Sequence, residues 1–258
     1  MQQFRNRVLR ALPTAELELL IPHLERVTLE RRSILCAPDR PIDSVAFPED
    51  ALVSILSMVS DGSALETAMV GNEGMVGLPL FHGVDRTVTH AFVQVAGEAH
   101  TLTSERFAEL LPQLPALQRR LHRYAVALFT MATQSSACNR KHTIDQRCAR
   151  WLLTAHDGAG RAQFDITQQF LSQMLGVRRA TVTVAAGLLQ RDQLISYSRG
   201  RLVVRDRPGL ERASCDCYHV VRDEIDRLLG DGDWLPSLPA SASSVVAVAD
   251  SVRGSHSS

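Results

Sequence analysis

The chain has 258 residues, and 45% of them are hydrophobic, which is enough to bury the cores of two modest domains. Its 28 basic and 28 acidic residues balance, so the chain is not an indiscriminate polycation. No apolar run reaches the length of a membrane span, and residues 1–7 lack the apolar core of a secretory signal, so we expect a cytoplasmic protein with no membrane partner.

Residues 27–102 predict a β-rich domain. Short segments around Phe47, from Leu52, before Gly71 and from His90 contain many β-branched residues and are separated by turn signals. Strands at this spacing are typical of a small barrel or jelly roll.

A glycine-dense turn at residues 70–77 interrupts these strands. Its glycines, among them Gly71 and Gly74, would let backbone amides approach a ligand closely, and Glu73 could accept a sugar hydroxyl. Taken alone, the segment is more typical of a barrel corner in which glycines only supply permissive torsions.

Residues 114–138 predict one long helix, with no Gly or Pro after Pro115. Its apolar residues recur at alternating steps of three and four, which is a heptad seam about three repeats long. The helix could pair with its own copy or lie against the barrel, and we expect a dimer helix. The seam contains Leu117, Leu121, Tyr124, Leu128 and Met131.

A second domain begins near Thr143, which forms a capping box with Gln146 and so ends the long helix near His142. Two short helices around Gly176 then give the pattern of a helix-turn-helix. The first begins at the N-cap Thr167. The second directs four apolar residues toward a core: Val182, Ala185, Ala186 and Leu189.

The exposed start of the second helix is cationic and polar, which suits contact with DNA bases. We expect base contacts from Arg178, Arg179, Thr181 and Thr183, because the N-terminal residues of a recognition helix reach base edges. Positive charge is concentrated in this region: residues 143–211 hold ten arginines against six acids, whereas residues 1–142 hold fourteen basic against fifteen acidic residues. A symmetric reader of DNA also needs a dimer.

Residues 194–204 predict a β-hairpin wing with Arg199 and Arg201 on either side of Gly200. These arginines suit contact with DNA phosphates. The alternative is an ordinary helical hairpin beside a two-stranded ribbon.

The five cysteines are odd in number and scattered, so we expect no disulfide framework. Only Cys215 and Cys217 are close in sequence, and one residue is a poor spacer for a zinc site. Buried thiols without a metal are therefore expected.

The order of these parts resembles the Crp-Fnr family of bacterial transcription regulators over about Leu9 to Tyr218. The resemblance implies an α+β fold: an N-terminal β jelly-roll (double-stranded β-helix) barrel in 1–112, a dimerisation helix in 113–142 and a winged helix-turn-helix in 143–217. Residues 218–258 would form a C-terminal helix and a disordered tail.

The same resemblance implies function. It predicts a homodimer that binds a palindromic operator in double-stranded DNA and contacts RNA polymerase, with Thr167 and Gln169 near the DNA backbone. The sequence does not say whether the protein activates or represses, or which operator it binds.

The barrel departs from the cyclic-AMP-responsive pattern of this family. Gly71, Glu73 and Gly74 keep the outline of a phosphate-binding loop, but Thr89 and His90 replace the arginine and serine that would hold a cyclic phosphate. Arg86 lies three residues from the expected place. Cyclic AMP is therefore doubtful as a ligand, and no cofactor is evident. These six residues are the candidate binding site for an unidentified effector.

Two alternative functions suit the sequence less well. A cupin-like metal enzyme would need convergent ligands, and His82, His90 and His100 lack the tight spacing of such a site. The second alternative is a ligand-binding module whose tail contacts another protein, and its partner binding would not depend on Arg179. We expect a regulator and no enzyme.

Overall fold

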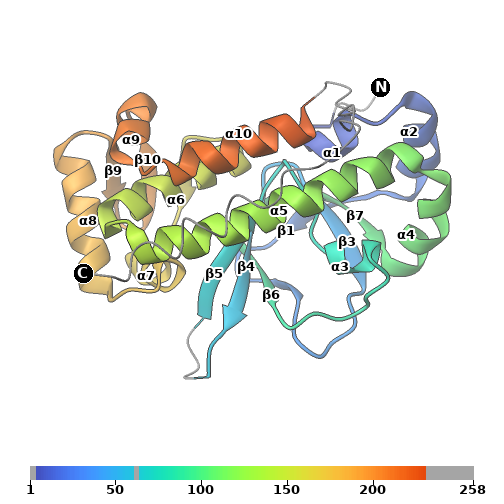
Figure 1. The fold of residues 1–258 in the computed structure, drawn as a ribbon, viewed down its shortest axis with the longest axis horizontal. Coiled ribbons are helices and arrows are strands. Elements are labelled where there is room, and N and C mark those ends of the chain that lie inside the picture. The colour runs from blue at the N-terminus through green and yellow to red at the C-terminus, as the bar shows by residue number, and fades with distance from the viewer. Residues whose placement is uncertain (1–3, 61–63, 231–258) are drawn as a thin grey trace, which may run out of the picture.

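The computed structural model describes residues 4–60 and 64–230. A β-rich domain lies under one long helix, and a smaller helical domain with its own small sheet lies at one end of that helix (Figure 1). The predicted α+β fold is confirmed.

Two antiparallel sheets form the N-terminal domain. Val53 pairs with Val70 on one side and with Val93 on the other, and all three side chains are buried. Both sheets contribute to one core, which also contains Phe47 and Leu102. One sheet has the order β1 (Glu25–Leu29), β7 (Gly97–Thr103), β3 (Ser44–Pro48), and the other β2 (Ile34–Cys36), β6 (His90–Val95), β4 (Leu52–Met58), β5 (Ala64–Val70).

Short helices flank the sheets. Glu16, on the second of them, accepts hydrogen bonds from the backbone N–H groups of Ala116 (2.7 Å) and Leu117 (3.0 Å), and so caps the long helix from outside it. These helices are α1 (Arg7–Arg10), α2 (Thr14–Leu20), η1 (Ile21–His23), α3 (Leu78–Phe81), α4 (Ser104–Leu110) and η2 (Leu111–Gln113).

The long helix α5 (Pro115–Lys141) lies across the barrel (Figure 1). It is one continuous helix that ends next to His142, as predicted. Its predicted dimer seam, however, faces inward: Leu117, Leu121, Tyr124 and Met131 are buried within the single chain, and Leu128 is partly buried. The seam is apolar because it packs against the barrel. Packing against the barrel was the alternative to pairing with a second copy of the helix. Four of these five side chains are therefore buried within the chain, away from the surface that a partner would contact.

The C-terminal domain begins at Thr143, where the predicted capping box with Gln146 is present. Its sheet has the order β8-β10-β9, and the first of these strands was not predicted because it is only three residues long. The elements are α6 (Ile144–Ala159), β8 (Gln163–Asp165), α7 (Gln168–Leu175), α8 (Arg179–Arg191), β9 (Ile195–Ser198), β10 (Arg201–Val204) and α9 (Arg207–Ala213).

The last described helix, α10 (Cys217–Leu229), returns along α5 and packs beside it (Figure 1). The predicted disordered tail beyond it falls largely on residues 231–258, which lie outside the described residues. Within the described residues, no helix combines the length and apolarity needed to cross a bilayer.

The cysteines are less scattered than their sequence positions suggested. Cys138 near the end of α5 meets Cys215 and Cys217 at the start of α10, because the two helices run side by side and their ends coincide. All five cysteines are free thiols.

Candidate nucleic-acid interface

The turn between α7 and α8 is built as the sequence predicted. Thr167 Oγ1 accepts the backbone N–H of Phe170 (3.1 Å) and caps α7. Gly176 has a φ of 63°, and its N–H and that of Val177 bond back to Gln173 and Ser172, which is a Schellman motif. This left-handed turn ends α7 and sets the direction of α8.

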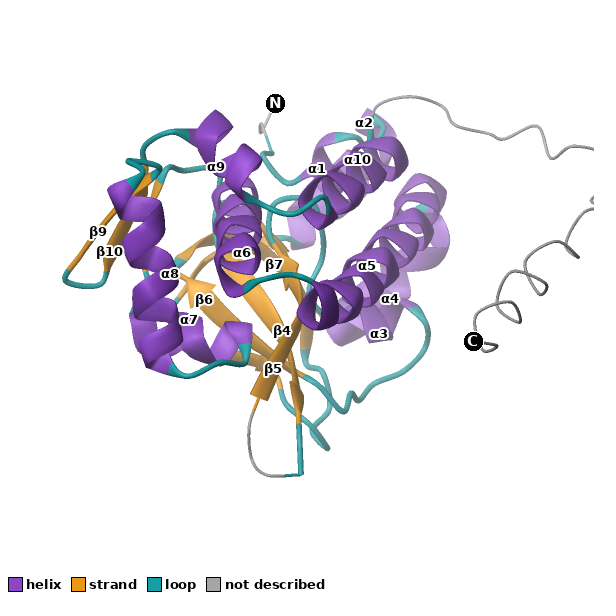
Figure 2. Ribbon diagram, turned by 60° about the vertical axis from the view of Figure 1, so that its left-hand side comes forward, coloured by secondary structure: helices purple, strands orange, loops and turns teal. Residues whose placement is uncertain are grey.

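Helix α8 buries one stripe and exposes the rest. The four buried residues are the predicted Val182, Ala185, Ala186 and Leu189. The predicted base-contacting residues Arg178, Arg179, Thr181 and Thr183 are all exposed. The helix lies on the outer surface of the molecule in both ribbon views (Figure 2).

Thr183, one of these exposed residues, forms hydrogen bonds within the domain. The hydroxyl of Thr183 donates toward Gln168 Oε1 (2.8 Å) and lies 3.1 Å from the backbone oxygen of Arg179. Thr183 therefore links α8 to α7, whereas Arg178, Arg179 and Thr181 extend from the first turn of α8.

The predicted wing is formed by β9 and β10. Arg199 (φ 50°) and Gly200 (φ 80°) form its two-residue tip, and two successive positive φ values are typical of a type I′ hairpin turn. Tyr197 fixes the wing, since its hydroxyl donates to the backbone oxygen of Ile166 (2.7 Å) and its N–H donates to Gln190 Oε1 (2.6 Å).

The start of α8 and the wing enclose two adjoining surface hollows. The first, of about 380 Å³, brings together Thr167, Arg179 and Arg199. The second, of about 590 Å³, also contains Arg201 and Arg31. Four of the predicted DNA-contacting residues therefore line one continuous basic surface, and Gln169 is exposed on α7 outside it. Arg31 was missed because it lies on the turn between β1 and β2, far away in sequence.

The C-terminal domain is attached to the barrel by a buried polar contact. The indole N–H of Trp151 on α6 donates to Glu66 Oε1 on β5 (2.8 Å), and Ser54 lies 2.5 Å from Glu66 Oε2. Burial raises the pKa of Glu66 to about 7. Phe92 of the barrel stacks on Phe170 of α7, with ring centroids 5.7 Å apart, and extends this contact.

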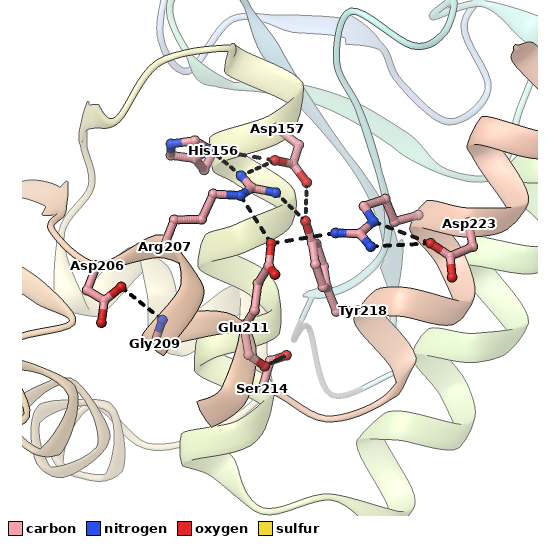
Figure 3. A network of polar contacts seen from close by, with 10 residues as sticks. His156, Asp157, Asp206, Arg207, Gly209, Glu211, Ser214, Tyr218 and Asp223 are labelled. Atoms are coloured by element: carbon pink, nitrogen blue, oxygen red, sulfur yellow. Dashed lines mark hydrogen bonds and ion pairs between the residues drawn. The ribbon is translucent and has the colours of Figure 1, made fainter.

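A second polar network joins α6, α9 and α10 (Figure 3). Arg207 lies at its centre: it donates to Asp157, to the Tyr218 hydroxyl (2.6 Å) and to Glu211 (3.1 Å). The Tyr218 hydroxyl donates to the other oxygen of Asp157 (2.7 Å). Burial alone would raise the pKa of Asp157, but hydrogen bonds from His156, Arg207 and Tyr218 hold it below its usual value.

The barrel contains an open cavity of about 620 Å³, which is within the usual range for small-molecule sites. Its lining is mostly apolar and includes Ile42, Ile55 and Val70. Leu128 of α5 forms part of the wall, so the cavity reaches the long helix.

The six candidate effector residues do not form one site. Arg86 and Thr89 line the cavity, whereas Gly71, Glu73, Gly74 and His90 are not among its lining residues. The glycines serve packing between segments instead: a Cβ atom at Gly74 would overlap the ring of Tyr124, and one at Gly71 would overlap the backbone of Gly158 on α6.

Glu73 has a local role as well. Its Oε1 accepts the backbone N–H of Gly71 (2.8 Å), which closes the turn.

The histidines considered for a metal enzyme have different surroundings. His82 lines the cavity, while His100 is buried against Phe4 and lies 3.6 Å from Glu49.

Comparisons with known proteins agree with this geometry. Residues 146–213 match the model of the Crp-like helix-turn-helix domain. A comparison with curated protein sequences finds no significant match.

Several solved structures have the same fold. FixK2 from Bradyrhizobium japonicum is 15% identical, with a TM-score of 0.62 over 74% of this chain and 98% of that one. A putative Crp/Fnr-family regulator from Eubacterium rectale is 15% identical, with a TM-score of 0.59 over 78% and 94%. The regulator CLP from Xanthomonas campestris is 18% identical, with a TM-score of 0.59 over 74% and 99%.

These similarities confirm the predicted helix-turn-helix domain and the predicted fold. The chain therefore contains a Crp-like helix-turn-helix domain in residues 146–213, and it shares its overall fold with FixK2 and with the Crp/Fnr-family regulator from Eubacterium rectale.

Proposed function

We propose that the protein acts in the cytoplasm as a homodimer that binds a palindromic operator through its two α8 helices and recruits or blocks RNA polymerase there. The observation that carries the proposal is the convergence of Arg179, Thr167 and Arg199 around one exposed hollow where α8 meets the wing. An arginine in the first turn of a recognition helix suits a guanine edge, and arginines on a wing suit phosphates.

Within this surface the residues have different proposed roles. Arg178, Arg179 and Thr181 contact base edges, and Thr183 supports them through its bond to Gln168. The backbone contacts come from Thr167, Gln169, Arg199 and Arg201. The division into a sensor barrel (1–112), a dimerisation helix (113–142), a DNA-binding domain (143–217) and a C-terminal segment (218–258) follows from these roles.

The dimer would use the face of α5 opposite to the predicted seam. Exposed residues recur on this face at alternating steps of three and four, which is the spacing of a coiled-coil seam. At its centre Phe129 is 69% exposed and Val126 is 50% exposed. Large apolar side chains exposed in this pattern favour pairing with a second copy. The face contains Arg119, His122, Val126, Phe129, Thr133, Ser136 and Arg140.

The effector site would be the cavity in the barrel. Its largely apolar wall suits an apolar or aromatic molecule better than a cyclic phosphodiester, and Arg86 is the one arginine among its lining residues. That arginine is already bonded to the backbone oxygen of Asp39 (2.6 Å) and lies beside Asp85. We therefore expect cyclic AMP to leave the melting temperature unchanged.

Selection of bound duplexes from a random DNA pool tests the main proposal. We expect an inverted repeat whose half-sites are centred about 34 to 36 Å apart, one helical turn. Arg179→Ala should weaken operator binding by about 1 to 3 kcal/mol and relax the preference at one base position. Arg201→Ala should weaken binding to all sequences and reduce the salt dependence by about one charge.

Arg106→Ala is the matched control, because Arg106 is an exposed arginine on α4, paired with Glu109 at the far end of the barrel. It should leave DNA binding unchanged. Equal losses on operator and random DNA for Arg179→Ala would show that this residue does not read bases.

Sedimentation tests the dimer. Phe129→Asp places a charge in the exposed stripe and should yield monomers, whereas Met131→Leu, a conservative change on the buried face, should not. A dimer that survives Phe129→Asp would refute the proposed interface.

A further inference from the structure

Four potential metal ligands converge where α5 ends and α10 begins. Cys138 and His142 come from the end of α5, and Cys215 and Cys217 from the start of α10. Their ligand atoms all lie within 4.8 Å of one another. The sulfurs of Cys138 and Cys215 are 3.5 Å apart, and the sulfur of Cys217 is 3.4 Å from His142 Nδ1.

The local structure shows how the four side chains meet. Cys138 and His142 are four residues apart, so they share one face of the last turn of α5, and His142 is its C-cap residue. Cys215 and Cys217 lie on either side of Asp216, the N-cap of α10. Because α10 packs along α5, the two pairs face each other.

The distance between the sulfurs of Cys138 and Cys215 and that between Cys217 and His142 are close to those of a tetrahedral zinc site. With bonds of about 2.3 Å to sulfur and about 2.0 Å to nitrogen, tetrahedral zinc places two sulfurs about 3.8 Å apart and a sulfur and a nitrogen about 3.5 Å apart. The three cysteines are at least 96% buried, so the site is closed, as structural zinc sites are. We propose that Cys138, His142, Cys215 and Cys217 bind one structural Zn²⁺ ion.

The charges around the cluster favour a thiolate centre. Zn²⁺ with three thiolates carries a net charge of −1, and two buried arginines lie nearby. Arg150 is 8% exposed and its Nε lacks a hydrogen-bond partner among the described residues, while the charge of Arg147 also acts on Cys138 and Cys215. Buried cations need compensating negative charge, which a zinc–thiolate centre supplies.

A disulfide or an iron–sulfur cluster would fit these four residues less well. A disulfide between Cys138 and Cys215 would give no role to the contact between Cys217 and His142, and it needs an oxidant. An iron–sulfur cluster would need ligands spread around several iron and sulfide atoms, whereas these four ligand atoms lie around a space suited to one ion.

The zinc ion would fix the junction between the two domains. It would link the end of α5, one residue before the Thr143 capping box, to the connection between α9 and α10. Both helices would then hold a constant position relative to the DNA-binding domain. The metal site itself does not depend on the proposed dimer or operator.

The test is elemental analysis of the full chain, purified without chelator or affinity metal. We expect one zinc per chain. Cys217→Ser and His142→Ala should each lower the zinc content about tenfold or more, because a closed site tolerates the loss of a ligand poorly. Cys36→Ala is the matched control, since Cys36 is a buried cysteine in the barrel, and its zinc content should equal that of the wild type.

Cobalt substitution gives a second measurement that does not rely on the variants folding. The wild-type chain, refolded with Co²⁺, should show the intense visible bands of a tetrahedral ion and thiolate-to-cobalt charge-transfer bands. A metal-free protein without these bands would overturn the proposal. So would mass spectra of thiol-blocked protein that show Cys138 joined to Cys215.

Discussion

Glu66 offers the sharpest test of how the barrel is joined to the DNA-binding domain. The Ser54 hydroxyl has one hydrogen but faces two acceptors, Glu66 Oε2 and Gln94 Oε1. A neutral Glu66 resolves this, because its own hydrogen is donated to Ser54, which then donates to Gln94. Glu66 Oε1 remains free to accept the Trp151 indole N–H. This arrangement of protons is consistent with the raised pKa of Glu66, which favours a protonated carboxyl group.

The raised pKa of Glu66 predicts that the free energy of unfolding is lower at neutral and alkaline pH than at acidic pH. Burial raises the pKa of Glu66 from its ordinary value of 4.5 to about 7, and at about 1.36 kcal/mol per pKa unit this difference corresponds to about 3 kcal/mol. Because the folded pKa is above the unfolded one, this stability is fully present below pH 4.5. It is lost as the pH rises through about 7, where folding must keep an ionised carboxylate buried.

Glu66→Gln mimics the protonated form without titrating, since its amide can accept from Trp151 and donate to Ser54. The free energy of unfolding of the wild type minus that of the variant should therefore fall by about 2 to 3 kcal/mol between pH 5 and pH 8. Urea unfolding followed by circular dichroism at each pH measures it. Glu30→Gln, at an exposed glutamate, is the control and should show no such trend. A difference that stays constant within about 0.5 kcal/mol over this pH range would refute a protonated Glu66.

Two further predictions concern backbone and capping positions. Gly176→Ala should lower the free energy of unfolding by about 1 to 2 kcal/mol because φ is 63° there, whereas Gly187→Ala, in open space on α8, should raise it by up to about 1 kcal/mol. Equal thermal shifts for both variants would contradict this. Glu16→Gln should cost about 1 to 3 kcal/mol in urea unfolding because it weakens the external cap of α5, and Glu18→Gln, exposed on the same helix, should be neutral. A neutral Glu16→Gln would show that the cap contributes little.

Local patterns in the sequence were sufficient to predict the helix-turn-helix. The cap at Thr167, the left-handed Gly176 and the buried stripe from Val182 to Leu189 all depend on residues within a few positions of each other. The wing followed from the same kind of signal, because Arg199 and Gly200 lie between two alternating segments.

Contacts between distant segments could not be predicted in this way. The heptad seam containing Leu121 showed that one face of α5 is buried, but a periodicity does not say whether a barrel or a second helix covers it. The cysteine cluster has a sequence signal, CysXXXHis followed by CysXCys, yet its halves lie more than seventy residues apart. They meet only because α10 returns along α5.

Helix α5 connects the cavity of the barrel to the DNA-binding domain. Leu128 lines the cavity, and the same helix ends at Lys141, just before the DNA-binding domain. A bound molecule can change DNA affinity only if it binds two states of the protein with different affinity, and its contact with Leu128 would let it distinguish two positions of α5. The exposed stripe of Phe129 lies one residue further along the helix, so a rotation of α5 that changes the cavity wall also changes the proposed dimer face. Ligand binding, dimer geometry and the spacing of the two α8 helices would then be coupled through one rigid element.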